Sequence, residues 1–493
     1  MHITSAAVPL DRPDQFYIDG RWVAPASTDT IEVVDSVTEQ VYYSVAEATD
    51  ADVAAAVGAA RAAFDDGPWP RMTHEQRAGY IREIGSALED RIADIAQIWP
   101  RESGILAGAV PAAMGEVTDA YSYYAGLAAT FPFEEPAVPS GGDGFGMIVR
   151  EPVGVVGAIV PWNVPMLLTA YKLAPALLAG CTVILKASPE APGSALVMAE
   201  IAEQVGLPAG VLNVLTADRE VSETLVRDPR VDKIAFTGST AAGKAIAGIM
   251  TERVGRFTLE LGGKSAAVIL DDADIAEAAR VLAGAECFLT GQICGSLTRI
   301  VVPRDRHDEM VEGLAEAFRQ VRVGDPFDPA VQMGPLATAQ QRERVERYVR
   351  IGLREGATLA AGGGRPAGLD RGWFVEPTVF GNVDNSWRIA QEEIFGPVLT
   401  VIPARDEQDA VRIANDSIYG LNASVFTRDV DRARAVARQL RSGTVGHNGN
   451  RADFGIGFGG VKQSGFGREG GVAGLLPYLE NKTVVLESRP VGA

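Results

Sequence analysis

The chain has 493 residues and carries 64 acidic against 45 basic residues, a formal net charge of −19. Nucleic acids and anionic membranes bind clustered lysine and arginine, so this balance excludes both as expected partners. Apolar residues make up 47% of the chain and charged residues 22%, which is typical of a globular protein with two or three domains.

The few cysteines and histidines indicate a reducing compartment and do not predict a metal site. Cys181, Cys287 and Cys294 are widely spaced, which excludes a disulfide scaffold and is typical of a reducing compartment. The four histidines lie far apart and no HExxH or CxxC occurs, so no metal site is predicted. Met1–Asp19 lacks the basic-then-apolar pattern of a signal peptide, and we therefore expect a cytoplasmic protein.

One uncharged stretch, Pro152–Tyr171, is long enough to span a membrane. Pro161, Asn163 and Pro165 interrupt its middle, where a spanning helix needs continuous hydrogen bonds. We interpret it instead as a buried strand, Val153–Val160, then a polar loop and a buried helix from about Met166.

From residue 150 onward, short apolar runs alternate with helical patterns. This alternation predicts parallel strands joined by helical crossovers, with helices on both faces of the sheet. The strands expected in a first block are Val153–Val160, Thr182–Lys186, Val211–Thr216, Lys233–Thr237 and Phe257–Leu261, with helices over Ser194–Val205 and Ala241–Arg253. A second block after a seam near 262–264 has strands Ala266–Leu270 and Arg299–Val302 and helices Ile275–Cys287 and Asp308–Val321.

The first 130 residues read as mostly helical, for example over Asp52–Phe64 and Glu75–Trp99. The segment Phe131–Arg150 begins with prolines, continues through four glycines and then turns apolar. Such a segment is more typical of a protruding arm than of a core element.

A phosphate-binding turn is suggested by Gly238-Ser239-Thr240-Ala241-Ala242-Gly243-Lys244-Ala245, which nearly matches GxxxxGK[ST]. Ala245 lacks the hydroxyl that would hold magnesium in a nucleoside triphosphatase. The remaining geometry suits a dinucleotide pyrophosphate at a helix N-terminus, and a turn without any ligand is an equal alternative. The GxGxxG patterns at 455–460 and 465–470 lack a preceding strand and a following helix, and we interpret both as loops.

Three side chains could carry chemistry. Cys294 lies in a polar loop between Gly291 and Gly295, where substrate could reach a thiol, although incidental thiols are commoner than nucleophiles. Glu260 stands in an apolar strand, where burial raises the pKa of a carboxyl toward that of a general base; an ion-paired structural Glu is the alternative. Asn163 follows a strand end and could donate to an oxyanion, or it could simply form a turn beside proline.

Taken together, six segments resemble the aldehyde dehydrogenase superfamily, in its order and over about residues 17–487. They are Pro161-Trp162-Asn163-Val164-Pro165, Phe236-Thr237-Gly238-Ser239-Thr240, Leu259-Glu260-Leu261-Gly262-Gly263-Lys264-Ser265, Gly291-Gln292-Ile293-Cys294, Glu392-Glu393-Ile394-Phe395-Gly396-Pro397-Val398, and Phe458-Gly459-Gly460 through Gly467-Arg468-Glu469. The resemblance implies an α/β fold with a Rossmann-like cofactor domain (1–130 and 150–262), a second α/β catalytic domain (263–461), and a small β oligomerisation arm with bridging segments (131–149 and 462–493).

The resemblance implies oxidation of an aldehyde to the acid with reduction of NAD(P)+. The Cys294 thiolate would attack the carbonyl, with the oxyanion held by the Asn163 amide and the Cys294 backbone N–H. Hydride transfer would leave a thioester, which water activated by Glu260 would hydrolyse. Lys172 and Glu469 match positions that look like a proton relay in the family.

The same resemblance assigns cofactor and substrate contacts. Residues implied around NAD are Ile159, Trp162, Lys186, Phe236, Gly238, Ser239, Leu261, Gly262, Glu393 and Phe395, with Lys186 and Glu393 at the two riboses and Ser239 at the pyrophosphate. Residues implied around the aldehyde are Val164, Leu167, Leu168, Tyr171, Phe288, Ile293, Gly295, Arg451 and Phe458. The pocket is largely apolar, so a medium aliphatic or aromatic aldehyde is expected. Arg451 could instead meet the carboxylate of a semialdehyde, or lie at the surface.

Three departures from the family pattern matter. Relatives that prefer NAD often have a Glu three residues after the lysine, where this chain has Pro189 and places Glu190 one residue later. NADP therefore remains an alternative cofactor, with Arg219 as a possible contact to a 2′-phosphate. The turn after the third strand contains Asp218 instead of glycine-rich sequence, and Cys287 stands where a bulky apolar side chain is usual.

Two other functions remain open: a CoA-acylating semialdehyde dehydrogenase, disfavoured by the presence of Glu260, and a catalytically silent structural or binding relative. The resemblance also implies a homodimer or homotetramer, in which the Phe131–Arg150 arm and the tail after Leu475 pair across subunits.

Overall fold

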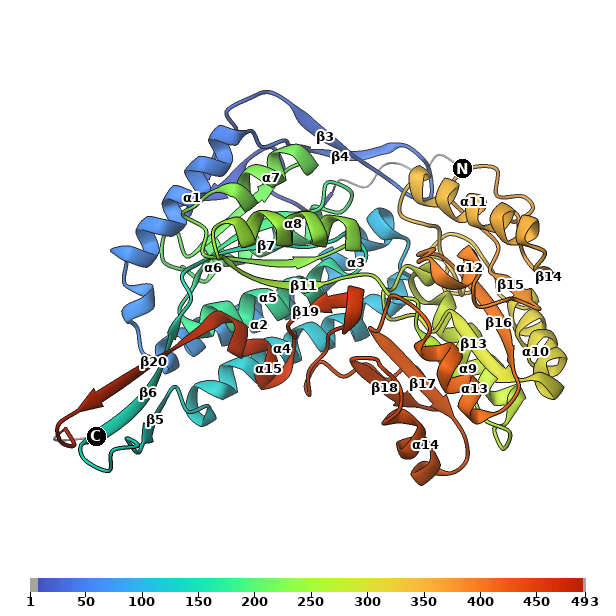
Figure 1. The fold of residues 1–493 in the computed structure, drawn as a ribbon. Coiled ribbons are helices and arrows are strands. Elements are labelled where there is room, and N and C mark those ends of the chain that lie inside the picture. Colours follow the sequence, from blue (N-terminus) through green and yellow to red (C-terminus); the bar gives the residue numbers. More distant parts are fainter. Residues whose placement is uncertain (1–7, 491–493) are drawn as a thin grey trace.

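The computed structural model describes residues 8–490 and is organised around two large sheets with a small sheet projecting to one side (Figure 1). We expect no targeting signal in Met1–Asp19, and residues 1–7 of that segment lie outside the described residues. So do residues 491–493 of the expected C-terminal bridging segment. The α/β fold class predicted from the sequence is confirmed.

The first sheet has eight strands in the order β19-β11-β10-β7-β8-β9-β1-β2. Their bounds are β1 (Phe16–Ile18), β2 (Arg21–Val23), β7 (Val155–Ile159), β8 (Thr182–Ala187), β9 (Leu212–Thr216), β10 (Lys233–Thr237), β11 (Arg256–Glu260) and β19 (Gly465–Phe466). The five central strands are parallel, as expected, but the sheet is mixed because β1, β2 and β19 pair antiparallel at its edges. These edge strands are only two or three residues long and carry no periodicity that the sequence could reveal.

Helices cover both faces of this sheet. They are α1 (Asp50–Asp65), α2 (His74–Asp90), α3 (Ile92–Ser103), α4 (Val110–Thr130), α5 (Pro165–Ala179), α6 (Gly193–Gln204), α7 (Arg219–Arg227) and α8 (Thr240–Glu252). Successive strand residues point to opposite faces. Val156 and Ala158 of β7 accordingly join the core under α2 to α6, whereas Val155 and Ile159 join the core under α1, α7 and α8.

The second sheet has seven strands in the order β14-β15-β16-β13-β12-β17-β18. The strands are β12 (Ala266–Ile269), β13 (Arg299–Pro303), β14 (Thr358–Ala361), β15 (Thr378–Gly381), β16 (Val398–Ala404), β17 (Asn422–Phe426) and β18 (Thr444–His447). Its helices are α9 (Ile275–Cys287), α10 (His307–Arg319), α11 (Ala339–Glu355), α12 (Arg388–Gln391), α13 (Glu407–Asn415) and α14 (Val430–Ala437). All neighbouring strands are parallel except β14 and β15, and apolar residues alternate between two cores as in the first sheet.

Two smaller sheets complete the fold. The hairpin of β3 (Thr30–Val34) and β4 (Val41–Ala46) stands by itself, and the projecting sheet contains β5 (Glu134–Ala137), β6 (Phe145–Pro152) and β20 (Leu479–Leu486) (Figure 1). β20 pairs antiparallel with β6 of the same chain, from Leu479 opposite Pro152 to Leu486 opposite Phe145. The predicted arm and tail therefore meet within one chain. Their pairing with a second subunit stays a prediction, as does the division into domains.

The first 130 residues are mostly helical, as expected, and they also contain the short strands β1 to β4. Two other expectations about local structure are wrong. The helix expected over Glu75–Trp99 is two helices separated at Arg91, whose guanidinium pairs with Asp94 at 2.6 Å and Glu200 at 2.7 Å. The strand expected over Val153–Val160 begins at Val155, because Gly154 has φ +128° and a side chain there would collide with the Asp232 carboxylate.

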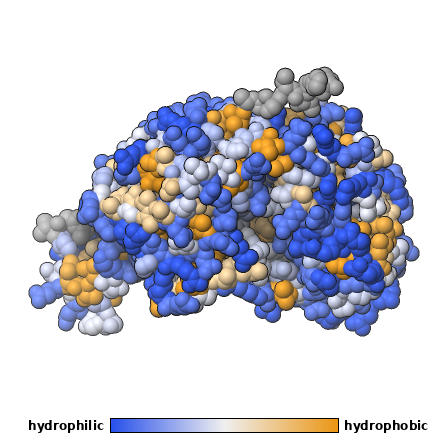
Figure 2. Space-filling view, turned by 90° about the horizontal axis from the view of Figure 1, so that it is seen from above, coloured by the Kyte–Doolittle hydropathy of each residue, from blue (hydrophilic) through white to orange (hydrophobic). Residues whose placement is uncertain are grey.

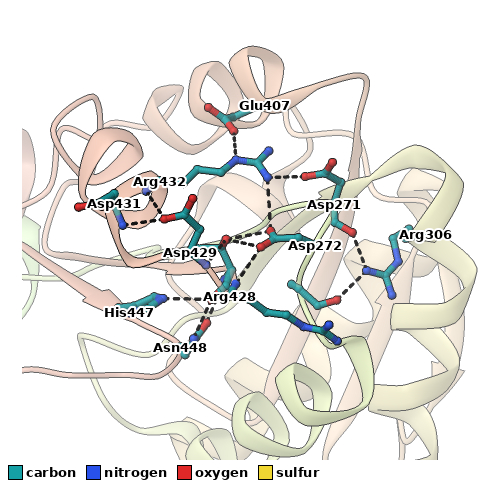
Figure 3. A network of polar contacts seen from close by, with 12 residues as sticks. Asp271, Asp272, Arg306, Glu407, Arg428, Asp429, Asp431, Arg432, His447 and Asn448 are labelled. Carbon is teal, nitrogen blue, oxygen red and sulfur yellow. Dashed lines mark hydrogen bonds and ion pairs between the residues drawn. The ribbon is translucent and has the colours of Figure 1, made fainter.

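An ionic network connects segments that follow the carboxyl ends of the second sheet (Figure 3). β12 leads into Asp271 and Asp272, and β17 leads into Thr427, whose hydroxyl donates to Asp272 at 2.8 Å. The Arg432 guanidinium lies 2.7 Å from Asp271 and 2.8 Å from Glu407. Cys294 precedes β13, so it belongs to the opposite, amino-terminal edge of this sheet.

The surface carries mostly hydrophilic residues on the face shown in Figure 2, with apolar residues in small separate patches. Among residues 8–490, none of the helices has both the length and the apolar character that crossing a membrane requires.

Candidate active site

The loop that carries Cys294 begins where α9 ends. It continues through the short helix η3 (Phe288–Gly291), in which Leu289 and Thr290 have φ of 50° and 56°. Left-handed backbone is costly for such residues and persists only where the surroundings impose it. The Thr290 hydroxyl contacts the carbonyls of Gly334 and Pro335 at 3.0 and 3.1 Å. The loop is thus held in a strained shape from outside.

Gln292 fixes the same loop two residues before the thiol. Its side-chain amide donates to the Ser103 carbonyl at 3.1 Å and accepts from the Ala337 backbone N–H at 2.9 Å. These two contacts tie the loop to both halves of the molecule, because Ser103 ends α3 and Ala337 precedes α11.

Cys294 is half-buried, whereas Cys181 and Cys287 are buried in apolar cores. Burial raises the pKa of the Cys294 thiol to about 12, with further contributions from the nearby carboxyls of Glu393 and Glu260. The thiol is therefore protonated at neutral pH unless positive charge enters the site.

Glu260 is the last residue of β11 and is 3% exposed. Neither of its carboxyl oxygens has a hydrogen-bond partner among the described residues. Gly459 permits this close packing, since a Cβ there would lie 2.6 Å from the carboxyl. Burial and then the charge of Glu469 raise the pKa of Glu260 well above its ordinary value, as a general base near neutral pH requires.

Asn163 lies in the turn between β7 and α5, at the carboxyl end of the strand. Its side-chain N–H donates to the Gln292 carbonyl at 2.8 Å, and its own carbonyl accepts from the Trp99 indole at 2.9 Å. The amide is thus oriented against the Cys294 loop. A buried N–H donor beside a thiol can stabilise an oxyanion that forms on an attacked carbonyl.

Lys172 and Glu469 form a fully buried ion pair, and the Lys172 ammonium also donates to the Thr237 hydroxyl at 2.6 Å. Both residues act electrostatically on Glu260, in opposite directions. The structure therefore brings together all five of the predicted catalytic side chains.

The predicted cofactor residues gather at the carboxyl ends of the first sheet, where ligands of parallel sheets bind. Ser239 is the N-cap of α8, its hydroxyl accepting from Ala242 N at 3.2 Å, and the Gly238 N–H donates to the Glu260 carbonyl at 3.0 Å. Lys186 lies near the end of β8 and is 7% exposed, and its ammonium makes no hydrogen bond within residues 8–490. Burial lowers its pKa to about 8, against the charges of Glu190 and Asp218.

The opposite wall of this region comes from the segment before β16. Glu393 accepts from the Gly263 N–H at 3.0 Å, and a Cβ at Gly262 would lie 2.5 Å from its carboxylate. The rings of Trp162 and Phe395 meet edge to face, with centroids 5.4 Å apart.

Three of the predicted cofactor residues are buried in the apolar core. Ile159, Phe236 and Leu261 are 5–7% exposed and belong to the apolar core under α8.

Most residues of the predicted substrate wall are apolar, and three aromatic rings form a stack there. Tyr171 stacks on Phe454 and Phe454 on Phe458, each pair with centroids 4.5 Å apart. Val164, Leu167, Leu168, Ile293 and the half-exposed Phe288 are the other apolar members, and the Gly295 carbonyl accepts from Asn422 at 2.9 Å. Arg451 is exposed and donates its Nε–H to the His447 carbonyl at 2.8 Å.

Sequence reasoning missed several residues of this region. Phe454 is the central ring of the stack, and its only signal is its position four residues before Phe458 in a glycine-rich loop. Gln292 and Asn422 hold the Cys294 loop through contacts to distant segments, which no local pattern reveals. Across residues 8–490, no group of three His, Cys, Asp or Glu side chains could hold a metal ion.

Comparison with known proteins places this geometry in a family. The sequence profile of the Aldehyde dehydrogenase family matches residues 22–484. Geranial dehydrogenase of Castellaniella defragrans is 44% identical over 95% of this chain and 98% of its own length. The 3-succinoylsemialdehyde-pyridine dehydrogenase of a Pseudomonas species is 43% identical over 96% of this chain and 98% of its own.

Solved structures agree with the sequences. The Mycobacterium tuberculosis aldehyde dehydrogenase complexed with NAD+ superposes with a TM-score of 0.94 at 45% identity, over 97% of this chain and 99% of that one. A mutant of aldehyde dehydrogenase C from Pseudomonas syringae, complexed with NAD+ and octanal, gives 0.94 at 39% identity, over 99% and 100%. This chain belongs to the aldehyde dehydrogenase family.

Proposed function

We propose that this enzyme oxidises a neutral, apolar aldehyde to its carboxylic acid, with NAD+ as the hydride acceptor and Cys294 as the nucleophile. The observation that carries the proposal is the meeting of three groups at one place: the half-buried thiol of Cys294, the unpartnered buried carboxyl of Glu260, and the Asn163 amide fixed against the thiol's loop. A relative named for geranial and a structure holding octanal support an apolar substrate.

In the first half-reaction the Cys294 thiol loses its proton to solvent, and Sγ then bonds to the aldehyde carbon as the carbonyl π bond breaks. The oxygen that becomes negative is held by the Asn163 amide and the Cys294 backbone N–H, which are fixed before the reaction begins. When bound, NAD+ supplies a cationic ring that favours the thiolate and accepts the hydride. The adduct that loses hydride becomes a thioester on Cys294.

The second half-reaction breaks that thioester. Glu260 takes a proton from water, the hydroxyl adds to the acyl carbon, and the Sγ–carbon bond breaks to release the carboxylic acid. The buried pair of Lys172 and Glu469 then provides a route by which Glu260 returns its proton to solvent. A rival acyl-CoA product would need no such base.

The residues around the cofactor region fit NAD. Lys186 offers a buried ammonium without a hydrogen-bond partner in residues 8–490, and the α8 N-terminus offers backbone N–H groups for a pyrophosphate. Glu393 offers a carboxylate for ribose hydroxyls beside Gly262. Glu190 and Asp218 place two negative charges near Lys186, which disfavours the 2′-phosphate of NADP.

The substrate assignment rests on the stacked rings and on charge. Tyr171 lies in the field of Glu116, Asp453 and Asp119, whereas Arg451 points its Nε–H at a backbone carbonyl. A carboxylated aldehyde would therefore meet repulsion at the entrance. We propose that Arg451 does not select semialdehydes.

A panel of aldehydes tests the function. With NAD+, a neutral aliphatic aldehyde is expected to exceed the semialdehyde of equal length by roughly tenfold in kcat/KM, because the entrance is acidic. NADP+ should give lower kcat/KM with both. Formation of reduced nicotinamide is followed by absorbance, and free acid and acyl-CoA are separated by chromatography with CoA present.

Three results of that panel would contradict the proposal. Acyl-CoA as the main product would make the enzyme a CoA-acylating relative, and no turnover of any aldehyde would make it a silent one. Comparable turnover of the two aldehydes, with a loss confined to the semialdehyde in Arg451→Gln, would restore Arg451 as a carboxylate contact.

The pH dependence of deacylation is a separate prediction. Glu260 acts as a base only when ionised, so the rate is expected to fall as pH drops through its raised pKa, well above the usual range for Glu. Glu469→Gln removes a negative charge near Glu260, lowers the pKa of Glu260, and should therefore move the fall in rate to lower pH. Lys172→Met removes a positive neighbour and should move it to higher pH. The pH dependence is measured from the single-turnover rate at which the carboxylic acid is released. Shifts in the opposite directions would show that Glu469 and Lys172 do not set the pKa of Glu260.

We also propose a cytoplasmic homo-oligomer, dimer or tetramer. The sheet of β5, β6 and β20 projects from the molecule and has exposed apolar residues at one edge, including Val485 at 64% exposure. An exposed apolar strand edge favours pairing with another strand.

A further inference from the structure

Trp99 is a buried residue of α3 that bonds directly to Asn163, the residue whose amide is the oxyanion donor in the scheme above. Trp99 is 1% exposed, and its indole N–H donates to the Asn163 backbone carbonyl at 2.9 Å. No other hydrogen bond to that carbonyl forms among residues 8–490. A buried carbonyl that loses its donor pays the full cost of desolvation. The placement of the Asn163 backbone therefore depends on Trp99.

The Asn163 side chain transmits this placement to the site. One N–H of its amide donates to the Gln292 carbonyl at 2.8 Å, two residues before Cys294. An amide has two N–H donors, so the other remains for the oxyanion. An oxyanion donor is effective only when it is fixed before the reaction begins. A shift of the Asn163 backbone would therefore move the donor relative to the thiol.

The same face of α3 also holds the loop that carries the thiol. Ser103 lies four residues after Trp99, so the two residues are neighbours on the helix surface. The Ser103 hydroxyl donates to the Trp99 carbonyl at 3.1 Å, and the Ser103 carbonyl accepts from the Gln292 side-chain amide at 3.1 Å. One helical turn thus contacts both the turn that carries Asn163 and the loop that carries Cys294.

The carboxyl end of α3 is fixed by contacts to other segments. The Ser36 backbone N–H donates to the Arg101 carbonyl at 2.8 Å. Gly104 ends the helix with φ +80°, and a Cβ there would collide with the Pro335 carbonyl oxygen. The Thr290 hydroxyl donates to that same carbonyl oxygen at 3.1 Å. The end of α3 and the Cys294 loop therefore pack on one segment, which gives the helix a defined position relative to the thiol.

We propose that Trp99 is a positioning residue for aldehyde oxidation, which sets the Asn163 amide relative to Cys294 through the Asn163 carbonyl. This role rests on the proposed function, which assigns Asn163 to the oxyanion. Trp99 acts on the step in which the aldehyde oxygen becomes negative. A reaction of the Cys294 thiol that forms no oxyanion should not depend on it.

Trp99→Phe tests this role, because it keeps a buried aromatic ring and removes the donor. With NAD+ and a neutral aliphatic aldehyde, kcat/KM is expected to fall about tenfold, since a contact to the transition state is weakened. Asn163→Ala removes the amide itself and should lower kcat/KM by about two to three orders of magnitude. Alkylation of Cys294 by iodoacetamide forms no oxyanion, so its rate constant in Trp99→Phe should stay near that of the wild type.

A double-variant cycle separates positioning from packing. Asn163→Ala keeps the backbone carbonyl that the indole bonds, so general damage caused by Trp99→Phe would persist in that background. If Trp99 acts through the Asn163 amide, kcat/KM of Trp99→Phe/Asn163→Ala should equal that of Asn163→Ala alone. An equal loss on adding Trp99→Phe to the wild type and to Asn163→Ala would make Trp99 purely structural.

Trp69→Phe is the matched control. Trp69 is also fully buried, but its indole N–H has no hydrogen-bond partner among the described residues. The loss of ring volume is the same, so Tm should fall while kcat/KM stays near that of the wild type. If Trp99→Phe does not fold, benzothienylalanine introduced at position 99 replaces only the indole N–H by sulfur and should give the same loss of kcat/KM.

The outcomes distinguish the role of Trp99 from the proposed function. Wild-type kcat/KM in Trp99→Phe, together with the expected loss in Asn163→Ala, would overturn the role of Trp99 alone. Wild-type kcat/KM in Asn163→Ala would overturn the oxyanion role of Asn163, and the role of Trp99 with it. A fall in the alkylation rate as large as the fall in kcat/KM would show that Trp99 acts on the thiol loop and not on the oxyanion donor.

Discussion

A Cys294→Ala variant is expected to lose aldehyde oxidation by at least about four orders of magnitude in kcat, because no other side chain can form the thioester. The change removes only a half-buried sulfur atom. The contacts that hold the loop come from Thr290 and Gln292, so the fold and NAD+ binding should persist. Stopped-flow absorbance measures turnover, and tryptophan fluorescence measures NAD+ binding.

Cys181→Ala is the matched control for this variant. Cys181 is fully buried, and burial raises its thiol pKa to about 11, so its sulfur is inaccessible and un-ionised at neutral pH. Its removal should cost stability and leave turnover near that of the wild type. Wild-type turnover in Cys294→Ala would exclude Cys294 as the nucleophile.

The regular elements were predictable where one local signal sufficed. β10 over Lys233–Thr237 and α9 over Ile275–Cys287 match the expected bounds. β10 is a wholly buried strand, and such strands read as continuous apolar runs. Asp274 caps α9 by accepting from Glu277 N at 3.1 Å, which fixes where that helix begins. The break at Arg91 was not predictable, because it depends on Glu200, which lies 109 residues away in the sequence.

The residues of the candidate site also differ in whether a local sequence signal identifies them. Cys294, Glu260 and Asn163 stand in segments whose pattern matches a family, so they were found from the sequence. Phe454, Gln292 and Asn422 contact segments that meet them only in the folded chain, so no local pattern reveals those contacts.

The two sheets also differ in which end of their strands contributes to the candidate site. Ligands of parallel sheets generally bind at the carboxyl ends of the strands, and the predicted cofactor residues lie at those ends in the first sheet. In the second sheet an ionic network of Asp271, Asp272 and Arg432 lies at those ends (Figure 3), and Cys294 approaches from the other edge. Two sheets of similar topology thus contribute opposite edges to one site: the first offers the cofactor region and Glu260, and the second offers the thiol.

A Glu260→Gln variant is expected to form the thioester and then stall. Glutamine has nearly the same shape but cannot take a proton from water, so deacylation should slow by about two to four orders of magnitude. The thiol should remain competent, because the substitution removes a carboxyl that raises its pKa. Rapid mixing should therefore give a burst of reduced nicotinamide near one equivalent per Cys294, followed by slow turnover.

Mass spectrometry of the quenched variant should detect the acyl group on the peptide that carries Cys294. Glu102→Gln is the matched control, since Glu102 is a similarly buried carboxyl with a pKa raised to about 7, and it should give no burst. An unchanged steady-state rate in Glu260→Gln would remove Glu260 from the mechanism. A slow rate without any burst would place its role before hydride transfer, and the base for hydrolysis would then have to be sought at Glu469 or Glu393, the other carboxyls in this region.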